Sequence, residues 1–351
     1  MPAPARNGRF PPAILKSGGP GRSTALVFAE GRARVPSLVV KASRAPAADA
    51  SVVREHGNLL QVRSRDSAFL RAGTPEPVAL EWDAGRPSLT LAARGSAVRL
   101  KDRPLREYLA PVRAEGTLLR ATAWLTRFAR EFGFGAVTLD DGELERRFAA
   151  PIDRYLRELR PGGREERALR EWAGRAGALR GLELPLPPAH GDFCPANVLD
   201  DGGEWLVIDW ETFQPAALPL SDLFHFLASL DWVRASGELR GNRGRNFSVA
   251  FLSDGPYRGA IDRCLRRACA DLAVPPAALD LLFLVHWVEA ALRKLEHLRE
   301  QGLDPLAPGA GDFDDAVPVV RFRSGSCENV RDSLERGQRL PWRAWDGAHV
   351  G

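Results

Sequence analysis

Apolar and polar positions along the chain predict a strand-rich N-terminal part and a helical remainder. Five short apolar runs, grouped around turns that contain glycine, lie at residues 14–17, 23–30, 34–43, 78–82 and 87–93. Runs of this length beside glycine turns predict antiparallel strands. Between the third and the fourth run, Val52, Glu55 and Leu59 share one face at helical spacing, which predicts a helix over residues 48–60.

Beyond residue 94, apolar side chains recur every three or four positions. One such stripe, which predicts a buried helix, consists of Leu118, Ala121, Leu125, Phe128 and Phe132. Further helices are predicted over residues 144–159, 165–179, 223–232, 261–272 and 279–298. Strands followed by helices indicate an α+β fold, and a chain of 351 residues is expected to form about two lobes.

The segment 189–211 combines ionisable side chains with two short apolar runs. His190, Asp192 and Asn197 stand in H-x-D-x-x-x-x-N spacing, and the second apolar run ends at Asp209. The Asp-Gly and Gly-Gly pairs between the runs predict a hairpin. If the hairpin loop is Asp201–Gly203, Asn197 faces Val207, and Asn197 and Asp209 share one face; a loop of even length would not place them so.

These residue types suit phosphoryl transfer. Mg²⁺ prefers hard oxygen ligands, which Asp209 and Asn197 can supply beside a bound triphosphate. Asp192 is then free to orient an attacking hydroxyl group and to accept its proton. Ordinary turn carboxylates, with Asp209 as a helix cap, are the simpler alternative for any single aspartate. The complete spaced set favours the catalytic interpretation.

Four sequence blocks carry a resemblance to a known family. They are His190-Gly191-Asp192, Asn197-Val198-Leu199, Ile208-Asp209-Trp210-Glu211 and Pro219-Leu220-Ser221-Asp222-Leu223. The chain resembles the aminoglycoside phosphotransferase and choline kinase group, which has the protein-kinase-like fold. The resemblance implies that Asp192 is the catalytic base, that Asn197 and Asp209 are metal ligands, and that His190 and Asp222 support the catalytic loop. In the catalytic loop of protein kinases an arginine usually stands between the His and the Asp, whereas this chain has Gly191.

The resemblance also implies a domain organisation. Residues 1–93 would form a small nucleotide-binding lobe with an antiparallel sheet and one helix. Residues 94–320 would form a larger, mainly helical lobe for catalysis and substrate binding, and residues 321–351 a C-terminal extension. ATP and Mg²⁺ are the cofactors that the resemblance implies. The choice of ATP over GTP rests on the resemblance, because no side chain at the expected hinge decides between adenine and guanine.

Lys41 is one of only four lysines among the 49 basic residues, and it lies in an apolar strand. In kinases a lysine on the third strand holds the α- and β-phosphates and pairs with a glutamate on the next helix, so Glu55 is the predicted partner. A snorkelling lysine and a solvated glutamate are the alternative. Ser17 and Gly19 are candidates for phosphate contact, although a plain hairpin turn explains the glycines equally well. Ala92 and Ala93 fall at the expected hinge.

Composition narrows the remaining possibilities. Although the net charge is +4 and the pI about 9.1, the basic residues are dispersed among 45 acidic ones, so nucleic acid is not an expected partner. No apolar run is long enough to span a bilayer, and no secretory signal follows Met1, which predicts a cytoplasmic protein. The four cysteines lack zinc-ligand spacing and are expected to be reduced thiols.

The sequence therefore predicts an ATP- and Mg²⁺-dependent phosphotransferase. Its acceptor would be a hydroxyl group of a small molecule such as a sugar, an amino alcohol or an aminoglycoside. A catalytically silent, nucleotide-binding scaffold of the same fold is the alternative, because the glycine loop Gly18-Gly19-Pro20-Gly21 departs from known nucleotide motifs. Nine tryptophans could supply an aromatic cage for a quaternary ammonium group, but the sequence does not locate one, and it does not predict the oligomeric state.

Overall fold

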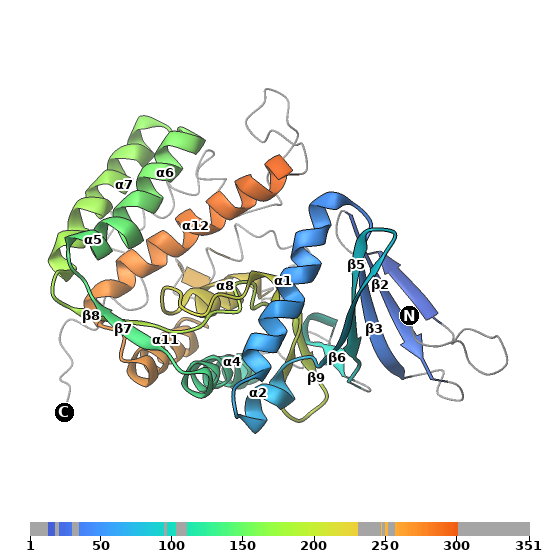
Figure 1. Cartoon of the computed structure of the whole chain (residues 1–351). Coiled ribbons are helices and arrows are strands. Elements are labelled where there is room, and N and C mark those ends of the chain that lie inside the picture. The colour runs from blue at the N-terminus through green and yellow to red at the C-terminus, as the bar shows by residue number, and fades with distance from the viewer. Residues whose placement is uncertain are drawn as a thin grey trace. The chain divides into compact units, whose positions relative to one another are not determined.

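The computed structural model describes residues 13–17, 21–29, 35–94, 97–102, 111–230, 247, 250–251 and 257–300. The chain folds into two compact units (Figure 1). The first, here called the sheet unit, groups Met1–Arg103 with His190–Gln214. The second, the helical unit, groups Pro104–Ala189 with Pro215–Gly351. The predicted lobe boundaries at residues 93 and 320 stay predictions.

The sheet unit contains a five-stranded antiparallel sheet in the order β1-β2-β3-β5-β4. The strands are β1 (Ala13–Ser17), β2 (Arg22–Phe28), β3 (Pro36–Ser43), β4 (Pro77–Asp83) and β5 (Arg86–Ala92). Each corresponds to one of the five apolar runs, so the predicted strands are confirmed. Lys41 lies on the central strand β3, opposite Thr24 of β2 and Leu89 of β5.

Helix α1 (Pro46–Arg63) packs against β3, β4 and β5 (Figure 1). It begins with Pro46, whose fixed φ and missing N–H suit the first helical position. Its buried side chains include Val52, Glu55 and Leu59, the three residues that the sequence placed on one face. A shorter helix, α2 (Ala68–Gly73), follows, and Ser67 caps it by accepting a hydrogen bond from the Leu70 N–H.

A second, three-stranded sheet of the same unit carries the catalytic segment. Its strands are β6 (Val98–Arg99), β9 (Val198–Asp200) and β10 (Leu206–Val207), in the order β10-β9-β6. Two 3₁₀ turns belong to the unit as well: η1 (Leu100–Asp102) follows β6, and η4 (Trp210–Thr212) follows β10.

The predicted register of the β9–β10 hairpin is wrong by one residue. Leu206 lies opposite Leu199 and Val207 opposite Val198, so Asn197 faces Ile208, whose N–H donates to the Asn197 carbonyl oxygen at 2.9 Å. The loop therefore has an even number of residues. Side chains of the loop itself decide this, because the carboxylates of Asp200 and Asp201 accept from the N–H groups two residues onward, each at 2.9 Å.

The helical unit confirms the predicted helices, with bounds that differ by a few residues. Its helices are α4 (Pro111–Phe132), α5 (Asp141–Leu144), α6 (Ala150–Leu159), α7 (Gly163–Arg175), α8 (Ser221–Ser229), α11 (Arg258–Leu272) and α12 (Leu279–Glu300). Shorter turns are the π-helical η2 (Glu145–Ala149) and the 3₁₀ turns η3 (Ala176–Leu179) and η5 (Pro276–Ala278). Strands β7 (Gly135–Thr138) and β8 (Glu183–Leu186) pair with each other.

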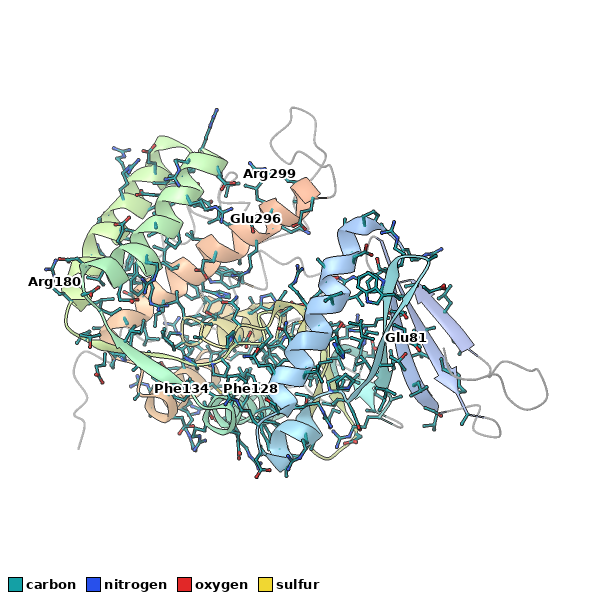
Figure 2. The ribbon with its side chains drawn as sticks, in the orientation of Figure 1. Glu81, Phe128, Phe134, Arg180, Glu296 and Arg299 are labelled. Atoms are coloured by element: carbon teal, nitrogen blue, oxygen red, sulfur yellow. The ribbon has the colours of Figure 1, made fainter. Side chains whose placement is uncertain are left out.

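Packing in the helical unit brings together helices that are distant in sequence. Helix α4 packs on α11 and α8, and α12 packs on α6 and α8. Ion pairs join α6 to α12, because Arg154 contacts Glu296, and Arg299 donates to Glu158 at 2.5 Å. Figure 2 labels Glu296 and Arg299 on α12. Among the described residues, no helix combines the length and the apolar composition needed to cross a bilayer. The predicted C-terminal extension, residues 321–351, lies outside the described residues.

Candidate active site

Lys41 is the centre of an ion-pair cluster in the sheet unit. Its Nζ donates to Glu55 Oε1 at 2.6 Å and to Glu55 Oε2 at 2.8 Å. The same Nζ contacts Asp209 Oδ1. The Glu55 side chain is only 2% exposed and that of Lys41 12%, whereas the Asp209 side chain keeps 34% exposure. The lysine thus joins strand β3 and helix α1 to Asp209, which lies two residues beyond the end of β10.

Burial and charge act in opposite directions on these three groups. Burial lowers the pKa of Lys41, but the negative charges of Glu55 and Asp209 outweigh burial and raise this pKa above its ordinary value. Burial raises the pKa of Asp209, yet the charge and hydrogen bond of Lys41 hold it below its ordinary value. For Glu55 burial prevails over Lys41 and raises the pKa. Lys41 and Asp209 are therefore a charged pair at neutral pH.

Asp209 has a backbone conformation that is rare for a residue with a side chain. Its φ is +67° and its ψ is +60°, the left-handed region that aspartate and asparagine tolerate better than most residues. Two hydrogen bonds hold the next residue: Trp210 Nε1 donates to the Val207 carbonyl, and Asn58 Nδ2 of α1 donates to the Trp210 carbonyl, both at 2.7 Å. The turn directs the Asp209 carboxylate to Lys41.

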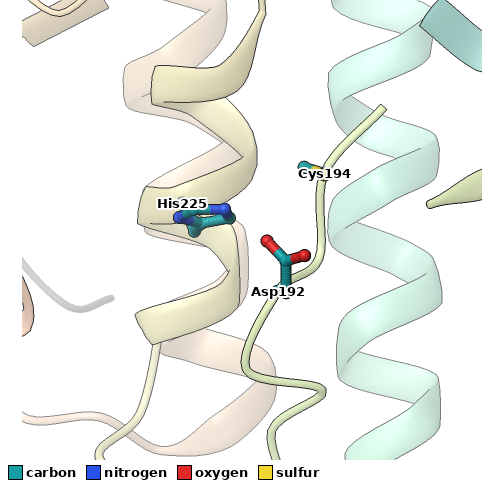
Figure 3. A group of neighbouring side chains, drawn as sticks. All are labelled: Asp192, Cys194 and His225. Carbon is teal, nitrogen blue, oxygen red and sulfur yellow. The ribbon is translucent and has the colours of Figure 1, made fainter. Parts of the chain in front are cut away.

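The loop between His190 and β9 positions Asp192 beside Asn197. Asn197 Nδ2 donates to Asp192 Oδ2 at 2.8 Å and to the Asp192 carbonyl oxygen at 3.0 Å. Asn197 is buried and Asp192 half-buried. Figure 3 shows Asp192 and Cys194 on this loop; His225, drawn in the same view, belongs to helix α8 of the helical unit. Because the amide of Asn197 uses its nitrogen on Asp192, its Oδ1 is left as a potential ligand.

His190 connects the loop to the chain around Asp209. Its ring is fully buried and meets the Trp210 ring edge-on, with centroids 4.7 Å apart. The Asp192 N–H donates to His190 Nδ1 at 3.3 Å, which assigns the proton to Nε2 and lets Nε2 donate to the Ile208 carbonyl at 3.0 Å. Both ring nitrogens are engaged within the protein.

Gly191 is held where no side chain fits. Its φ is +84°, and a Cβ atom at this position would lie 2.4 Å from the Thr212 carbonyl oxygen. Thr212 Oγ1 also donates to the His190 carbonyl at 2.9 Å, which keeps the two segments in contact. The departure from arginine between His190 and Asp192 therefore has a steric cause.

The remaining sequence candidates lie in varied surroundings. The Ala92 N–H donates to the Glu76 carbonyl at 2.9 Å and the Ala93 N–H to the Ser37 carbonyl at 3.0 Å, so the N–H groups of both residues predicted to form the hinge have partners within the sheet unit. The backbone of Ser17 pairs with Ser23, while the Ser17 side chain and Gly19 lie outside the described residues.

Asp222 belongs to the helical unit, on helix α8. It is buried and, together with Thr122, Thr126 and Ser221, is among the polar residues that line a small, partly open pocket of about 30 Å³. A volume of this size holds roughly one or two water molecules, and water is stable there only beside polar partners such as these.

Two residue pairs of the site were not predicted from the sequence. Arg22, the first residue of β2, forms an ion pair with Glu211, and Asn58 holds the Trp210 carbonyl as described above. The position of Arg22 directly after the glycine loop was the only available signal for the first pair. Nothing in the sequence pointed to Asn58, because its partner is a backbone group 152 residues away.

Comparisons with known proteins agree with these observations. The sequence model of a family described as "Phosphotransferase enzyme family" matches residues 17–260. No curated protein matches the chain.

The solved structures to which this chain is similar include kinases of several small molecules. A choline/ethanolamine kinase family protein from Mesorhizobium loti has a TM-score of 0.49 and 19% identity, covering 93% of this chain and 90% of its own. A glucosamine kinase has a TM-score of 0.46 and 17% identity, covering 92% and 94%. The aminoglycoside phosphotransferase APH(4)-Ia, a thermostable mutant bound to ADP and hygromycin B, has a TM-score of 0.47 and 16% identity, covering 92% and 94%.

Proposed function

The chain belongs to the phosphotransferase enzyme family, and on that premise we propose that it transfers the γ-phosphate of ATP, with Mg²⁺, to a hydroxyl group of a small molecule. Membership confirms the resemblance and the α+β, protein-kinase-like fold, and it makes the chain a small-molecule kinase. The observation that carries the finer proposal is the contact of Lys41 with both Glu55 and Asp209.

Lys41 is proposed to hold the phosphates of the nucleotide. A buried ammonium group that two carboxylates keep charged is pre-positioned, so it loses little conformational freedom when phosphate oxygens replace one of its partners. Glu55 is the partner that stays, because its carboxylate is deeply buried and contacts Lys41 through both oxygens.

The donor set fits a hard divalent cation. Asp209 supplies a carboxylate that is ionised at neutral pH, and Asn197 supplies an amide oxygen from a side chain that is fixed by Asp192. Magnesium, when bound there, neutralises negative charge that develops on the transferred phosphoryl group. The observed hairpin register does not by itself put Asn197 and Asp209 on one face. Their assignment as the protein ligands of the metal therefore rests on the family motif and on the left-handed turn that re-aims Asp209.

Asp192 is proposed to orient the acceptor hydroxyl and to accept its proton. Two contacts fix this residue: its N–H donates to His190, and its carboxylate accepts from Asn197. A half-buried carboxylate of fixed orientation suits a general base, since positioning supplies most of the rate in phosphoryl transfer. His190 acts here as a positioning residue, because both of its ring nitrogens are already in use.

The acceptor is proposed to be a sugar, an amino alcohol or an aminoglycoside-like molecule. A panel of such compounds, glucosamine, choline and hygromycin B among them, tests this part of the proposal by ADP release with and without Mg²⁺. The cytoplasmic location expected from the sequence remains a prediction.

Asp209→Asn and Asp192→Asn test the two central assignments. Asparagine keeps the size of each side chain and tolerates the left-handed backbone of Asp209, but it removes the charge. We expect the turnover number to fall about 10²- to 10⁴-fold in both variants with little change in melting temperature. Asp201→Asn, in the exposed turn between β9 and β10, is the matched control. Wild-type turnover in Asp209→Asn, or turnover that needs no divalent metal, would refute the metal assignment.

A further inference from the structure

A second cation of the sheet unit contacts the segment that carries Asp209. The Arg22 guanidinium forms an ion pair with Glu211 Oε2, although the two residues are 189 positions apart in the chain. Both side chains are half-buried, with 28% and 22% exposure. Lys41 on Asp209 and Arg22 on Glu211 are thus two cations, from adjacent strands, that meet carboxylates two residues apart.

The strand register places Arg22 on the same side of the sheet as Lys41. Arg22 lies opposite Ser43, and Lys41 lies opposite Thr24. Because side chains two residues apart on a strand share a face, and so do directly opposed residues, all four point to one face. That face is the one covered by α1, since Lys41 contacts Glu55 and Ser43 Oγ donates to Asp49 at 2.5 Å.

The backbone at Arg22 is fixed, so that only the side chain is free to change partners. The Arg44 N–H donates to the carbonyl of Gly21, the residue before Arg22, at 2.7 Å. Gly21 has a φ of +76°, and a Cβ atom there would lie 3.0 Å from the Cβ of Ala45. Arg22 therefore starts from an anchored position immediately after the glycine loop of residues 18–21.

The charges of this cluster favour an exchange of partners. Three carboxylates (Glu55, Asp209 and Glu211) face two cations (Lys41 and Arg22), which gives a formal charge of −1. A divalent cation beside Asp209 changes that charge to +1. The ion pairs of the carboxylates with Arg22 and Lys41 then contribute less to stability, because the metal neutralises part of the negative charge. A site with an excess of positive charge favours an anionic ligand.

We propose that Arg22 is a second phosphate-binding cation of the nucleotide site. In the nucleotide-free protein Glu211 holds its guanidinium, and on binding the guanidinium moves from Glu211 to phosphate oxygens, which suit its planar fork of donors. The inference rests on the proposed function, because it takes a nucleotide as the ligand of this site. It adds a residue from β2 to the lysine that kinases use.

Binding of ATP and of adenosine to purified full-length variants tests the proposal. Calorimetric titrations with and without Mg²⁺ would compare wild type, Arg22→Ala and Arg22→Lys. We expect Arg22→Ala to weaken ATP binding about tenfold to hundredfold while adenosine binding stays within about twofold, because only ATP offers phosphate oxygens. Arg22→Lys should fall between wild type and alanine. Arg86→Ala is the matched control, since Arg86, the first residue of β5 in the same sheet, forms a part-buried ion pair with Asp49 of α1.

Glu211→Gln distinguishes a phosphate-binding role of Arg22 from a purely structural role of its ion pair with Glu211. With EDTA present, the proposal expects ATP to bind this variant at least as tightly as wild type, and expects any gain to vanish in the Arg22→Ala, Glu211→Gln double variant. Equal weakening of ATP and adenosine by Arg22→Ala, or unchanged ATP binding, overturns the proposal. So does a Glu211→Gln variant that behaves like Arg22→Ala. If the wild-type protein binds no ATP, the proposed function itself fails.

Discussion

Individual residues of the site are fixed by close backbone contacts as well as by their own chemistry. Gly191 illustrates this, since it has a positive φ and its Cα faces the Thr212 carbonyl so closely that no Cβ fits. The neighbours His190 and Asp192 both make hydrogen bonds that depend on this path of the chain. A change at a residue with no functional side chain should therefore disturb the catalytic loop.

Gly191→Ala should lower both stability and turnover. The methyl group meets the Thr212 carbonyl oxygen, and the positive φ adds strain, so we expect a loss of at least about 2 kcal/mol in the free energy of unfolding. Gly202→Ala is the control, because Gly202 also has a positive φ, +94°, but a Cβ atom there would meet nothing within 4 Å. Urea titrations of both variants measure the difference. Equal losses would show that contact with Thr212 is unimportant.

At the scale of elements, helix α1 couples strand β3 to the turn after β10. Glu55 and Asn58 are three residues apart, so they lie on one side of the helix. Glu55 binds Lys41, and Asn58 binds the carbonyl of Trp210, the residue after Asp209. A single helix face therefore sets the positions of a proposed phosphate ligand and of a proposed metal ligand.

Asn58→Ala should raise the Mg²⁺ concentration needed for half-maximal turnover. Loss of the hydrogen bond releases the backbone beside Asp209, and we expect a stability loss of only about 1 kcal/mol. Ser51→Ala is the matched control on the same helix, because the Ser51 hydroxyl donates to the Ala48 carbonyl within α1. Metal titrations of initial rates provide the measurement. An unchanged Mg²⁺ requirement in Asn58→Ala would exclude a positioning role for this residue.

At the scale of the whole molecule, the described site residues divide unequally between the two units. Lys41, Glu55, Asp192, Asn197 and Asp209 all belong to the sheet unit, because the chain returns to it over His190–Gln214. The helical unit contains Asp222 and, separately, a cluster of aromatic side chains with His286: Phe224, Phe247, Phe251, Phe283 and Trp287.

This aromatic cluster is packed core. Its members are at most 7% exposed, and neighbouring rings contact one another, as with His286 and Trp287 at 4.6 Å between centroids. An aromatic cage for a quaternary ammonium group needs open ring faces, which these buried residues do not offer in the described part of the chain.

His286 should make the helical unit less stable in acid. Burial, with Arg293 and His225 nearby, holds the pKa of His286 well below its ordinary value. As the pH falls below about 6.5, the unfolded chain binds a proton that the folded chain does not, so stability decreases by up to about 1.4 kcal/mol per pH unit. The melting temperature should therefore fall less between pH 7 and pH 5 in His286→Phe than in the wild-type protein.

Phe283→Leu serves as the comparison for that measurement. This substitution removes part of the same cluster and should lower stability at every pH. It should not change how steeply the melting temperature falls with pH. A His286→Phe variant with the wild-type slope would assign the acid sensitivity to other groups.

The sequence by itself determined the five strands of the first sheet, helix α1 and the main helices of the helical unit, which follow from periodicity and glycine turns, properties of neighbouring residues. The Lys41–Glu55 pair, which the structure confirms, followed from the pattern that kinases show. The roles of His190, Asp192, Asn197 and Asp209 stay predictions from motif spacing and the family resemblance.

Only the tertiary structure decided the β9–β10 register, the contact that requires Gly191, the hydrogen bond from Asn58 and the Arg22–Glu211 pair. Most of these depend on atoms far apart in the chain, so local patterns carry no record of them. The register is different, because it depends on which local turn hydrogen bonds form, and the Asp and Gly residues of the loop are compatible with more than one turn.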